Sequence, residues 1–163
     1  MAIQVMVSTS GSQLLPPEAV STLLSSLLPL TTILTPNLPE ARLLLKTAGV
    51  SVKDPQNVDD IVAIAHSLLS LGPKWVLLKG GHLPLTKGKV VSKEESDREV
   101  ILNVLVGESG LNLLESKYVK SENTHGTGCS LACKSLRSGL RHNSTNRVLT
   151  ERKLQLPVIL RLV

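Results

Sequence analysis

The sequence predicts an α/β fold, a three-layer sandwich in which a mostly parallel sheet lies between two layers of helices. Two observations carry this prediction. Short apolar segments rich in β-branched residues alternate with segments of helical periodicity, and short turns join them. Parallel strands need crossover connections, and helices in those connections cover both faces of the sheet. With 163 residues, the chain is long enough for one domain with a core but too short for two ordinary domains.

The first helix is expected where two prolines meet an acidic residue. Proline is tolerated in the first helical turn and an acid is favoured there, so the helix begins at Pro16-Pro17-Glu18. A short strand over 5–7 and a polar turn precede it. Apolar residues then recur at helical spacing and give the helix one buried face: Val20, Leu23, Leu24, Leu27 and Leu28.

Two further pairs of strand and helix follow. A β-branched strand over 32–35 ends at Pro36, and a helix over 39–48 ends at Gly49. Asp54 is expected to cap a helix over 54–71 that ends at Gly72, before a strand over 74–78. Spacing predicts an inner stripe on that helix made of Ile61, Ile64, Ala65 and Leu68.

The pattern changes after residue 100, where an antiparallel hairpin is expected. Its strands cover 100–106 and 111–119, and a turn over 107–110 joins them. A charged loop over 86–97 precedes the hairpin. The hairpin leads into a glycine-rich segment that opens another apparent helix.

This segment, 123–130 (Asn-Thr-His-Gly-Thr-Gly-Cys-Ser), predicts an anion-binding cradle. Gly126 and Gly128 around one small hydroxyl residue let consecutive backbone N–H groups point the same way, and the helix start adds the positive end of its dipole. The same field favours the thiolate form of Cys129, so the site suits phosphoryl transfer. The alternative is a tight turn that leads into a helix, with Cys129 as an inert small apolar residue.

Two more motifs follow predicted strands. Segment 35–41 (Thr-Pro-Asn-Leu-Pro-Glu-Ala) comes after one strand, and segment 79–82 (Lys-Gly-Gly-His) comes after another. Ligands of parallel sheets bind beyond the carboxyl ends of the strands, so the motifs are expected at one edge. Simpler alternatives stay open, because Glu40 also favours a helix start and a lysine at a strand end also reaches water.

Charge and aromatic content exclude nucleic acid as the expected partner. Residues 1–132 carry 11 Lys+Arg against 12 Asp+Glu, whereas 133–163 carry 7 against Glu151 alone, so only the tail is basic. A basic end is more often solvated than a binding arm. Trp75 and Tyr118 are the only aromatic residues among Phe, Trp and Tyr, which excludes a stacking platform for bases.

A membrane span, a disulfide framework and a zinc site are not expected either. No amino-terminal signal pattern occurs, and no apolar stretch approaches the roughly 20 residues that span a bilayer, so a soluble, cytoplasmic protein is expected. Cys129 and Cys133 lie four residues apart, which does not suit a disulfide framework. With His125 they form a stripe that lacks a suitably spaced fourth zinc ligand.

In this order, the three motifs resemble those of the hydroxymethylpyrimidine and phosphomethylpyrimidine kinases of thiamine biosynthesis, members of the ribokinase-like superfamily. The resemblance takes in segment 5–11 (Val-Met-Val-Ser-Thr-Ser-Gly) and runs to about Leu131. It implies a partial ribokinase-like domain over 1–140 and a divergent basic tail over 141–163. It also implies ATP-dependent phosphorylation of 4-amino-5-hydroxymethyl-2-methylpyrimidine and then of its monophosphate.

The resemblance assigns a role to each residue of the glycine-rich segment. The backbone of Gly126, Thr127 and Gly128 would stabilise the transferring phosphate. Cys129 would stand at the position of the catalytic base, where many relatives carry Asp. Val5 and Cys129 would contact the pyrimidine substrate.

The other two motifs are assigned to the cofactors ATP and Mg²⁺. Asn37 and Glu40 match an Asn-x-x-Glu element that holds magnesium and the phosphates through water, with Glu40 on the metal side. Hydrated magnesium favours such oxygen ligands. Lys79 would meet the nucleotide as a point charge.

The sequence also departs from the family. Relatives read Asp-Pro-Val-Met where segment 3–6 reads Ile-Gln-Val-Met, and after Leu131 they continue with an Ala-rich helix. A preceding strand and its glycine loops are missing, so a truncated copy is expected, with a bare sheet edge that favours self-association into a homo-oligomer. Two alternatives stay open: a pyridoxal-type kinase of the same superfamily, and a non-catalytic fragment that binds nucleotide weakly.

Overall fold

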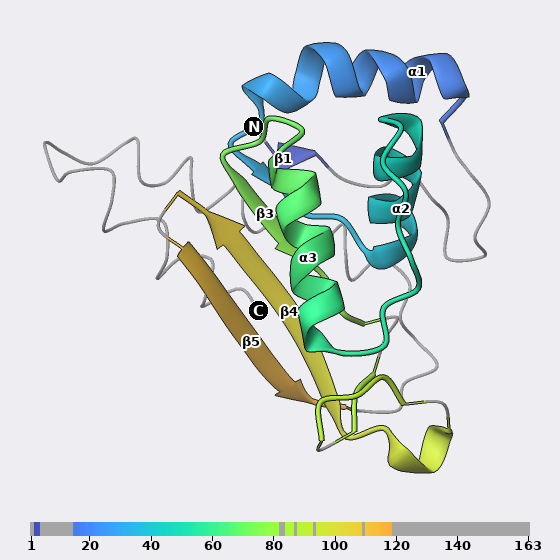
Figure 1. The fold of residues 1–163 in the computed structure, drawn as a ribbon. Coiled ribbons are helices and arrows are strands. Elements are labelled where there is room, and N and C mark those ends of the chain that lie inside the picture. The colour runs from blue at the N-terminus through green and yellow to red at the C-terminus, as the bar shows by residue number, and fades with distance from the viewer. Residues whose placement is uncertain are drawn as a thin grey trace, which may run out of the picture.

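The computed structural model describes residues 2–3, 15–81, 84–86, 88–92, 94–108 and 110–118. Five strands form one mixed sheet in sequence order (Figure 1). The first three strands run parallel, and the last two add an antiparallel hairpin. The α/β class and the change of pairing after residue 100 are therefore confirmed. The strands are β1 Ala2–Ile3, β2 Ile33–Leu34, β3 Trp75–Leu78, β4 Val100–Gly107 and β5 Gly110–Lys117.

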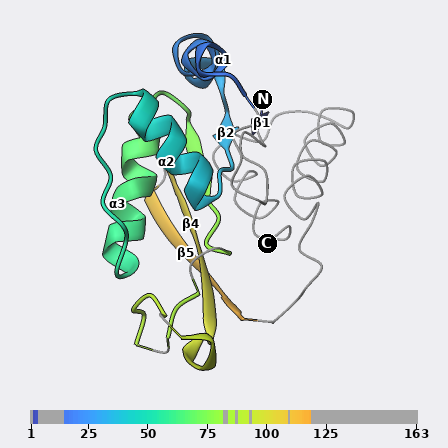
Figure 2. The same cartoon turned by 90° about the vertical axis from the view of Figure 1, so that its right-hand side faces the viewer.

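The helices of the described residues cover one face of the sheet. α2 (Leu38–Thr47) and α3 (Val58–Leu69) lie on the same side, and α1 (Pro17–Thr22) lies beyond one end of the strands, next to α2 (Figure 2). α1 continues as a π-helical turn, η1 (Leu23–Leu27), and a 3₁₀ turn, η2 (Leu28–Leu30). The helix expected after Gly126, which could cover the second face, lies outside the described residues.

Alternation along β3 builds a core on both faces of the sheet. Val76 and Leu78 belong to the main cluster, which includes both covering helices, whereas Trp75 and Leu77 pack with Leu105 on the opposite face. Opposite faces receive successive side chains because a strand has a period of two residues. The helices contribute to the main cluster Ala41, Leu44, Leu45, Ile61, Ile64, Ala65 and Leu68, so the predicted inner stripe of α3 is confirmed.

The predicted start of α3 is wrong by one turn. The helix begins at Val58 instead of Asp54, because Asn57 is its cap and accepts a hydrogen bond from the Asp60 backbone N–H at 2.9 Å. The Asp60 carboxylate in turn accepts from the Gln56 N–H at 2.8 Å. An asparagine with a carboxylate three residues later satisfies two backbone donors, which favours this start over the upstream Asp-Pro pair.

The structure contains an amino-terminal strand that was not expected, β1 at Ala2–Ile3, which pairs in parallel with β2. The strand predicted over 5–7 lies outside the described residues and stays a prediction. The helix start at Pro16-Pro17 is confirmed, with Pro16 as the cap and Pro17 as the first helical residue.

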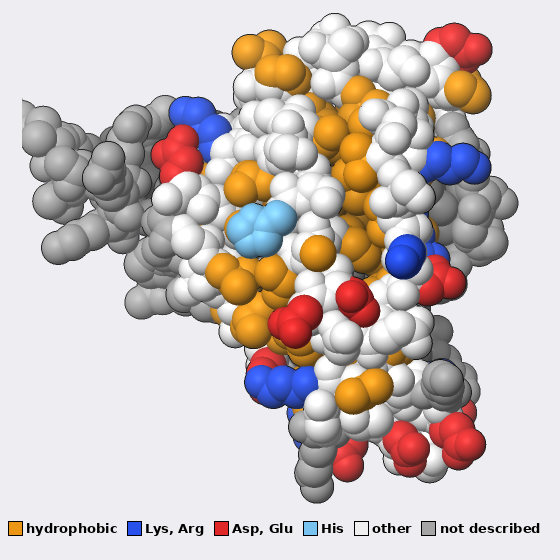
Figure 3. Space-filling view, viewed as in Figure 1, with side chains coloured by type: hydrophobic (Ala, Val, Ile, Leu, Met, Phe, Trp, Pro, Cys, Tyr) orange, Lys and Arg blue, Asp and Glu red, His pale blue; other side chains and the backbone are white. Residues whose placement is uncertain are grey.

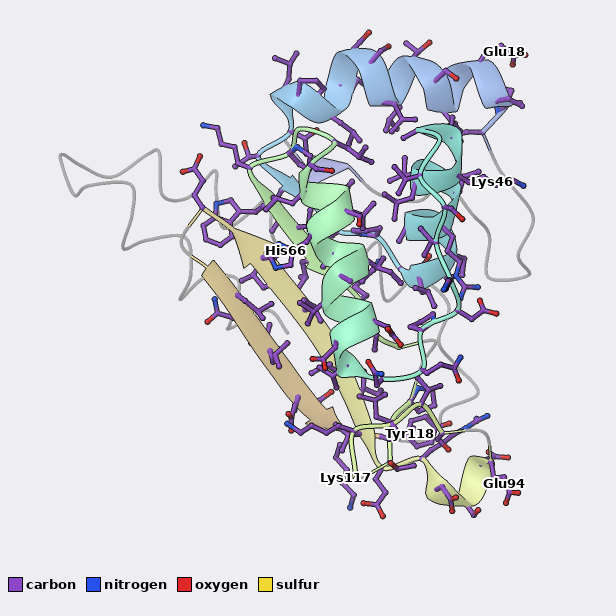
Figure 4. All side chains as sticks on the ribbon, in the orientation of Figure 1. Glu18, Lys46, His66, Glu94, Lys117 and Tyr118 are labelled. Atoms are coloured by element: carbon purple, nitrogen blue, oxygen red, sulfur yellow. The ribbon has the colours of Figure 1, made fainter. Side chains whose placement is uncertain are left out.

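The charged segment before β4 is tied to the rest of the fold. Val91 donates its N–H to the Gln56 carbonyl at 2.9 Å, just before α3, and the Lys89 ammonium lies 2.5 Å from the Glu115 carboxylate on β5. Tyr118 follows β5 at the same end of the sheet (Figure 4), and its ring centroid lies 6.0 Å from the Arg98 guanidinium carbon. The loop predicted over 86–97 is thus anchored to both the helical layer and the hairpin.

Apolar side chains reach the surface along the line where α2 meets α3 (Figure 3). Both helices also carry partly buried apolar residues that pack on the main cluster, among them Leu43 of α2 and Val62 and Leu69 of α3. None of the helices in the described part of the chain has the length and apolar composition needed to cross a membrane.

Removal of a buried leucine from α3 should destabilise the fold. Leu68 is fully buried in the main cluster, so Leu68→Ala should lower the free energy of unfolding by about 2–5 kcal/mol through lost burial and a cavity. Leu30→Ala is the control, because Leu30 is 75% exposed and its loss should change stability by about 0.5 kcal/mol or less. Urea unfolding followed by circular dichroism measures both. Equal shifts for the two variants would contradict the observed core.

Candidate functional site

The candidate site lies where β2 and β3 end. Lys79 donates its N–H to the Pro36 carbonyl at 2.9 Å, and Asn37 and Lys79 form an isolated parallel bridge. The pairing of the two strands thus continues beyond their assigned ends. Because the segments after β2 and β3 both leave the sheet at its carboxyl edge, two sequence motifs that lie some 40 residues apart become neighbours.

The first motif forms a capping box at the start of α2. The Asn37 Oδ1 atom accepts from the Glu40 N–H at 2.9 Å, and the Glu40 Oε2 atom accepts from the Asn37 N–H at 2.9 Å. Glu40 is only 2% exposed. Asn37 and Glu40 therefore stabilise the start of α2, as the simpler alternative for Glu40 predicted, since both side chains satisfy backbone donors that a helix start leaves unpaired.

The second motif is pressed against β4. Gly80 donates its N–H to the Asn103 Oδ1 atom at 3.1 Å, and a Cβ atom built on Gly80 would lie 1.8 Å from the Leu102 carbonyl oxygen. A Cβ built on Gly81 would meet nothing within 4 Å. Only glycine fits at position 80, because any other residue would push the loop away from β4.

Asn103 is the residue of this site that sequence reasoning missed. Its neighbours predict only a hairpin strand, although it is the one polar residue in the apolar run 100–106. A polar side chain in a strand core needs a partner. That break in the apolar pattern is the signal that could have singled it out, whereas its partner 23 residues away could come only from the tertiary structure.

The edge can attract and orient an anion. The start of α2 places the positive end of a helix dipole there, and Lys79 adds a cation directly after the neighbouring strand β3. Thr35, which follows β2, is 2% exposed, and its hydroxyl has no hydrogen-bond partner among the residues that the structure describes. Within the described ranges, no three His, Cys, Asp or Glu side chains cluster as direct metal ligands would.

The remaining predicted site residues cannot be placed by the structure. Val5, Gly126, Thr127, Gly128 and Cys129 all lie outside the described residues. The structure therefore brings together the two motifs predicted to bind the cofactors, and the predicted catalytic and substrate residues remain predictions.

Glycine at position 80 should be essential for the shape of this edge. Gly80→Ala should lower the free energy of unfolding by about 1–3 kcal/mol, because the methyl group would overlap the Leu102 carbonyl. Gly81→Ala is a matched control, since that position has open space. Chemical denaturation of both variants tests the difference. If Gly81→Ala were as destabilising as Gly80→Ala, the close contact with β4 would not be the cause.

The family match and the curated relative both indicate the same family of kinases. The model of the family described as phosphomethylpyrimidine kinase matches residues 4–144. A hydroxymethylpyrimidine/phosphomethylpyrimidine kinase of Salmonella typhimurium is 34% identical over 156 residues, which cover 96% of this chain and 52% of that protein.

Two solved structures resemble the fold. A phosphomethylpyrimidine kinase from Clostridium difficile has a TM-score of 0.58 at 30% identity, with 97% of this chain and 53% of that chain covered. The ADP complex of Bacillus subtilis pyridoxal kinase has a TM-score of 0.65 at 25% identity, with 98% and 49% covered. The chain thus spans about half the length of each of these relatives. The predicted ribokinase-like architecture is confirmed, and because the family model covers most of the sequence, the chain belongs to the phosphomethylpyrimidine kinase family.

Proposed function

We propose that the protein transfers the terminal phosphate of ATP to hydroxymethylpyrimidine and then to its monophosphate, in the biosynthesis of thiamine diphosphate. The observation that carries the proposal is the Asn37–Lys79 bridge, because it joins two segments that resemble motifs of this kinase family and lie within the matched residues 4–144. The bridge lies at the carboxyl edge of parallel strands, where ligands of such sheets bind. The name of the Salmonella relative supports the pyrimidine substrate. The ADP complex of the pyridoxal kinase supports a nucleotide as phosphate donor.

The edge supplies what phosphoryl transfer asks of a protein, which is positioning and neutralisation of charge. The α2 amino terminus and Lys79 would favour the phosphates of ATP. Glu40 and Asn37 would hold Mg²⁺ through water molecules, in keeping with carboxylate and amide oxygens fixed beside that helix start. When bound, the metal ion would neutralise phosphate charge.

The glycine-rich segment would complete the site. In this proposal, the backbone N–H groups of Gly126, Thr127 and Gly128 stabilise the charge on the transferring phosphate. Cys129 removes the proton from the hydroxymethyl group, and Val5 with Cys129 contacts the pyrimidine. These roles are supported by the match of the family model to the whole of this segment.

A pyridoxal-type kinase is the second candidate. It is favoured by the fold similarity to the Bacillus subtilis pyridoxal kinase, whose TM-score exceeds that of the Clostridium difficile enzyme. The pyrimidine kinase hypothesis agrees with the matching family model and the Salmonella relative. The third hypothesis is a chain that binds nucleotide without catalysis, and it predicts binding of Mg-ATP with no turnover of either substrate.

Variants at two helix caps can distinguish an effect on nucleotide binding from an effect on stability. Asn37→Ala and Asn57→Ala should each lower the free energy of unfolding by about 0.5–2 kcal/mol, because each removes the cap of one helix. Only Asn37→Ala should weaken Mg-ATP binding, by about tenfold or more, because only Asn37 lies beside Lys79. Titration calorimetry measures the affinities, and urea unfolding measures stability. Equal affinity of the two variants would leave Asn37 with the capping role alone.

Cysteine 129 should be needed for turnover. Cys129→Ala should lower kcat about 10²–10⁴-fold, the usual contribution of a general base. Cys133→Ala, four residues further along the chain, should retain activity. The assay follows ATP-dependent phosphorylation of hydroxymethylpyrimidine, with pyridoxal as a parallel substrate. Turnover of pyridoxal alone would favour the second candidate, and Mg-ATP binding without turnover of either substrate would favour the non-catalytic reading.

A further inference from the structure

Asn103 stands out in β4 as a polar side chain between two buried apolar residues, Leu102 and Val104. Its backbone lies opposite Leu114 of β5, while its side chain reaches in the other direction, to the segment that follows β3. The Oδ1 atom accepts the Gly80 N–H at 3.1 Å. A half-buried amide is costly without such a partner, so this hydrogen bond accounts for the polar residue in the strand.

Together with two other contacts, this bond holds the backbone at Lys79 and Gly80 from both sides, an arrangement that we call the clamp. On one side, the Lys79 N–H donates to the Pro36 carbonyl at 2.9 Å and holds the segment against the end of β2. On the other side, Asn103 holds the next residue, and the Leu102 carbonyl occupies the space where a Gly80 side chain would be. The backbone of Lys79 is thus fixed from both neighbouring strands.

We propose that Asn103 is a positioning residue, which places Lys79 at the nucleotide through its hydrogen bond to Gly80. The effect on nucleotide affinity rests on the function proposed above, whereas the effect on the Gly80 backbone does not. Asn103 itself touches no phosphate in this account. Loss of its acceptor leaves the Gly80 N–H without a partner, and the segment after β3 moves away from β4. The backbone that carries the Lys79 side chain is then no longer fixed.

Three variants test the role of the acceptor. Asn103→Leu keeps the size of the side chain and removes the acceptor, and Asn103→Asp keeps an oxygen at the same position. Asn112→Leu is the control, because Asn112 lies on the neighbouring strand β5 opposite Leu105. If Asn103→Leu does not fold, Asn103→Ser replaces it, since the shorter side chain ends before the Gly80 N–H.

Two measurements are made on each variant. Amide hydrogen exchange of Gly80, followed by NMR, measures how well its N–H is protected by the hydrogen bond. Titration calorimetry measures the affinity for Mg-ATP. We expect about tenfold faster Gly80 exchange and about tenfold weaker Mg-ATP binding for Asn103→Leu. Asn103→Asp and Asn112→Leu should stay within about threefold of the unchanged chain in both measurements, because each leaves an acceptor at position 103.

The outcomes separate this inference from the proposed function. Unchanged Gly80 exchange in Asn103→Leu, or an Asn103→Asp variant as impaired as Asn103→Leu, would overturn the positioning role. Faster exchange with unchanged Mg-ATP affinity would overturn it as well, because Lys79 would not depend on the clamp. If the unchanged chain binds no Mg-ATP, the proposed function fails, and Gly80 exchange with its recovery in Asn103→Asp still decides whether Asn103 fixes the segment.

Discussion

The candidate site depends on one hydrogen bond between backbones, from the Lys79 N–H to the Pro36 carbonyl. Strands β2 and β3 have few paired residues, so their relative register is set over a short length. The extra bond carries that register past the ends of both strands. It places the start of α2 beside Lys79, and a shift of one residue would turn the two motifs to different sides of the sheet.

The β4 strand supports this arrangement from the other side. Gly80 lies against the Leu102 carbonyl, and Asn103 accepts its N–H, so the segment after β3 cannot swing away from the sheet. The hairpin thus contributes more to the molecule than an antiparallel edge. It fixes the backbone on which the cation of the site is carried, although neither of its strands belongs to a recognised motif.

The capping box at Asn37 and Glu40 shows how one geometry serves both stability and ligand binding. The two side chains satisfy donors at the start of α2, and the same helix start presents the positive end of its dipole at the edge where a phosphate would lie. A structural role for these residues is therefore compatible with the proposed one. The cap of α3 at Asn57 has the same chemistry away from the Asn37–Lys79 bridge, which makes it the natural reference for separating the two roles.

The sequence by itself determined the alternation of strands and helices, the inner stripe of α3 and the motifs at the strand ends, because these depend on local periodicity and on residues such as Pro36 that stop a strand. It misplaced the start of α3, since Asp54 and Asn57 are both good caps and only the Asn57–Asp60 hydrogen bonds decide between them. Only the tertiary structure decided that Asn37 meets Lys79 and that Asn103 holds Gly80. Those contacts join residues far apart in the chain, and their partners are selected by sheet register and close packing, which no local pattern encodes.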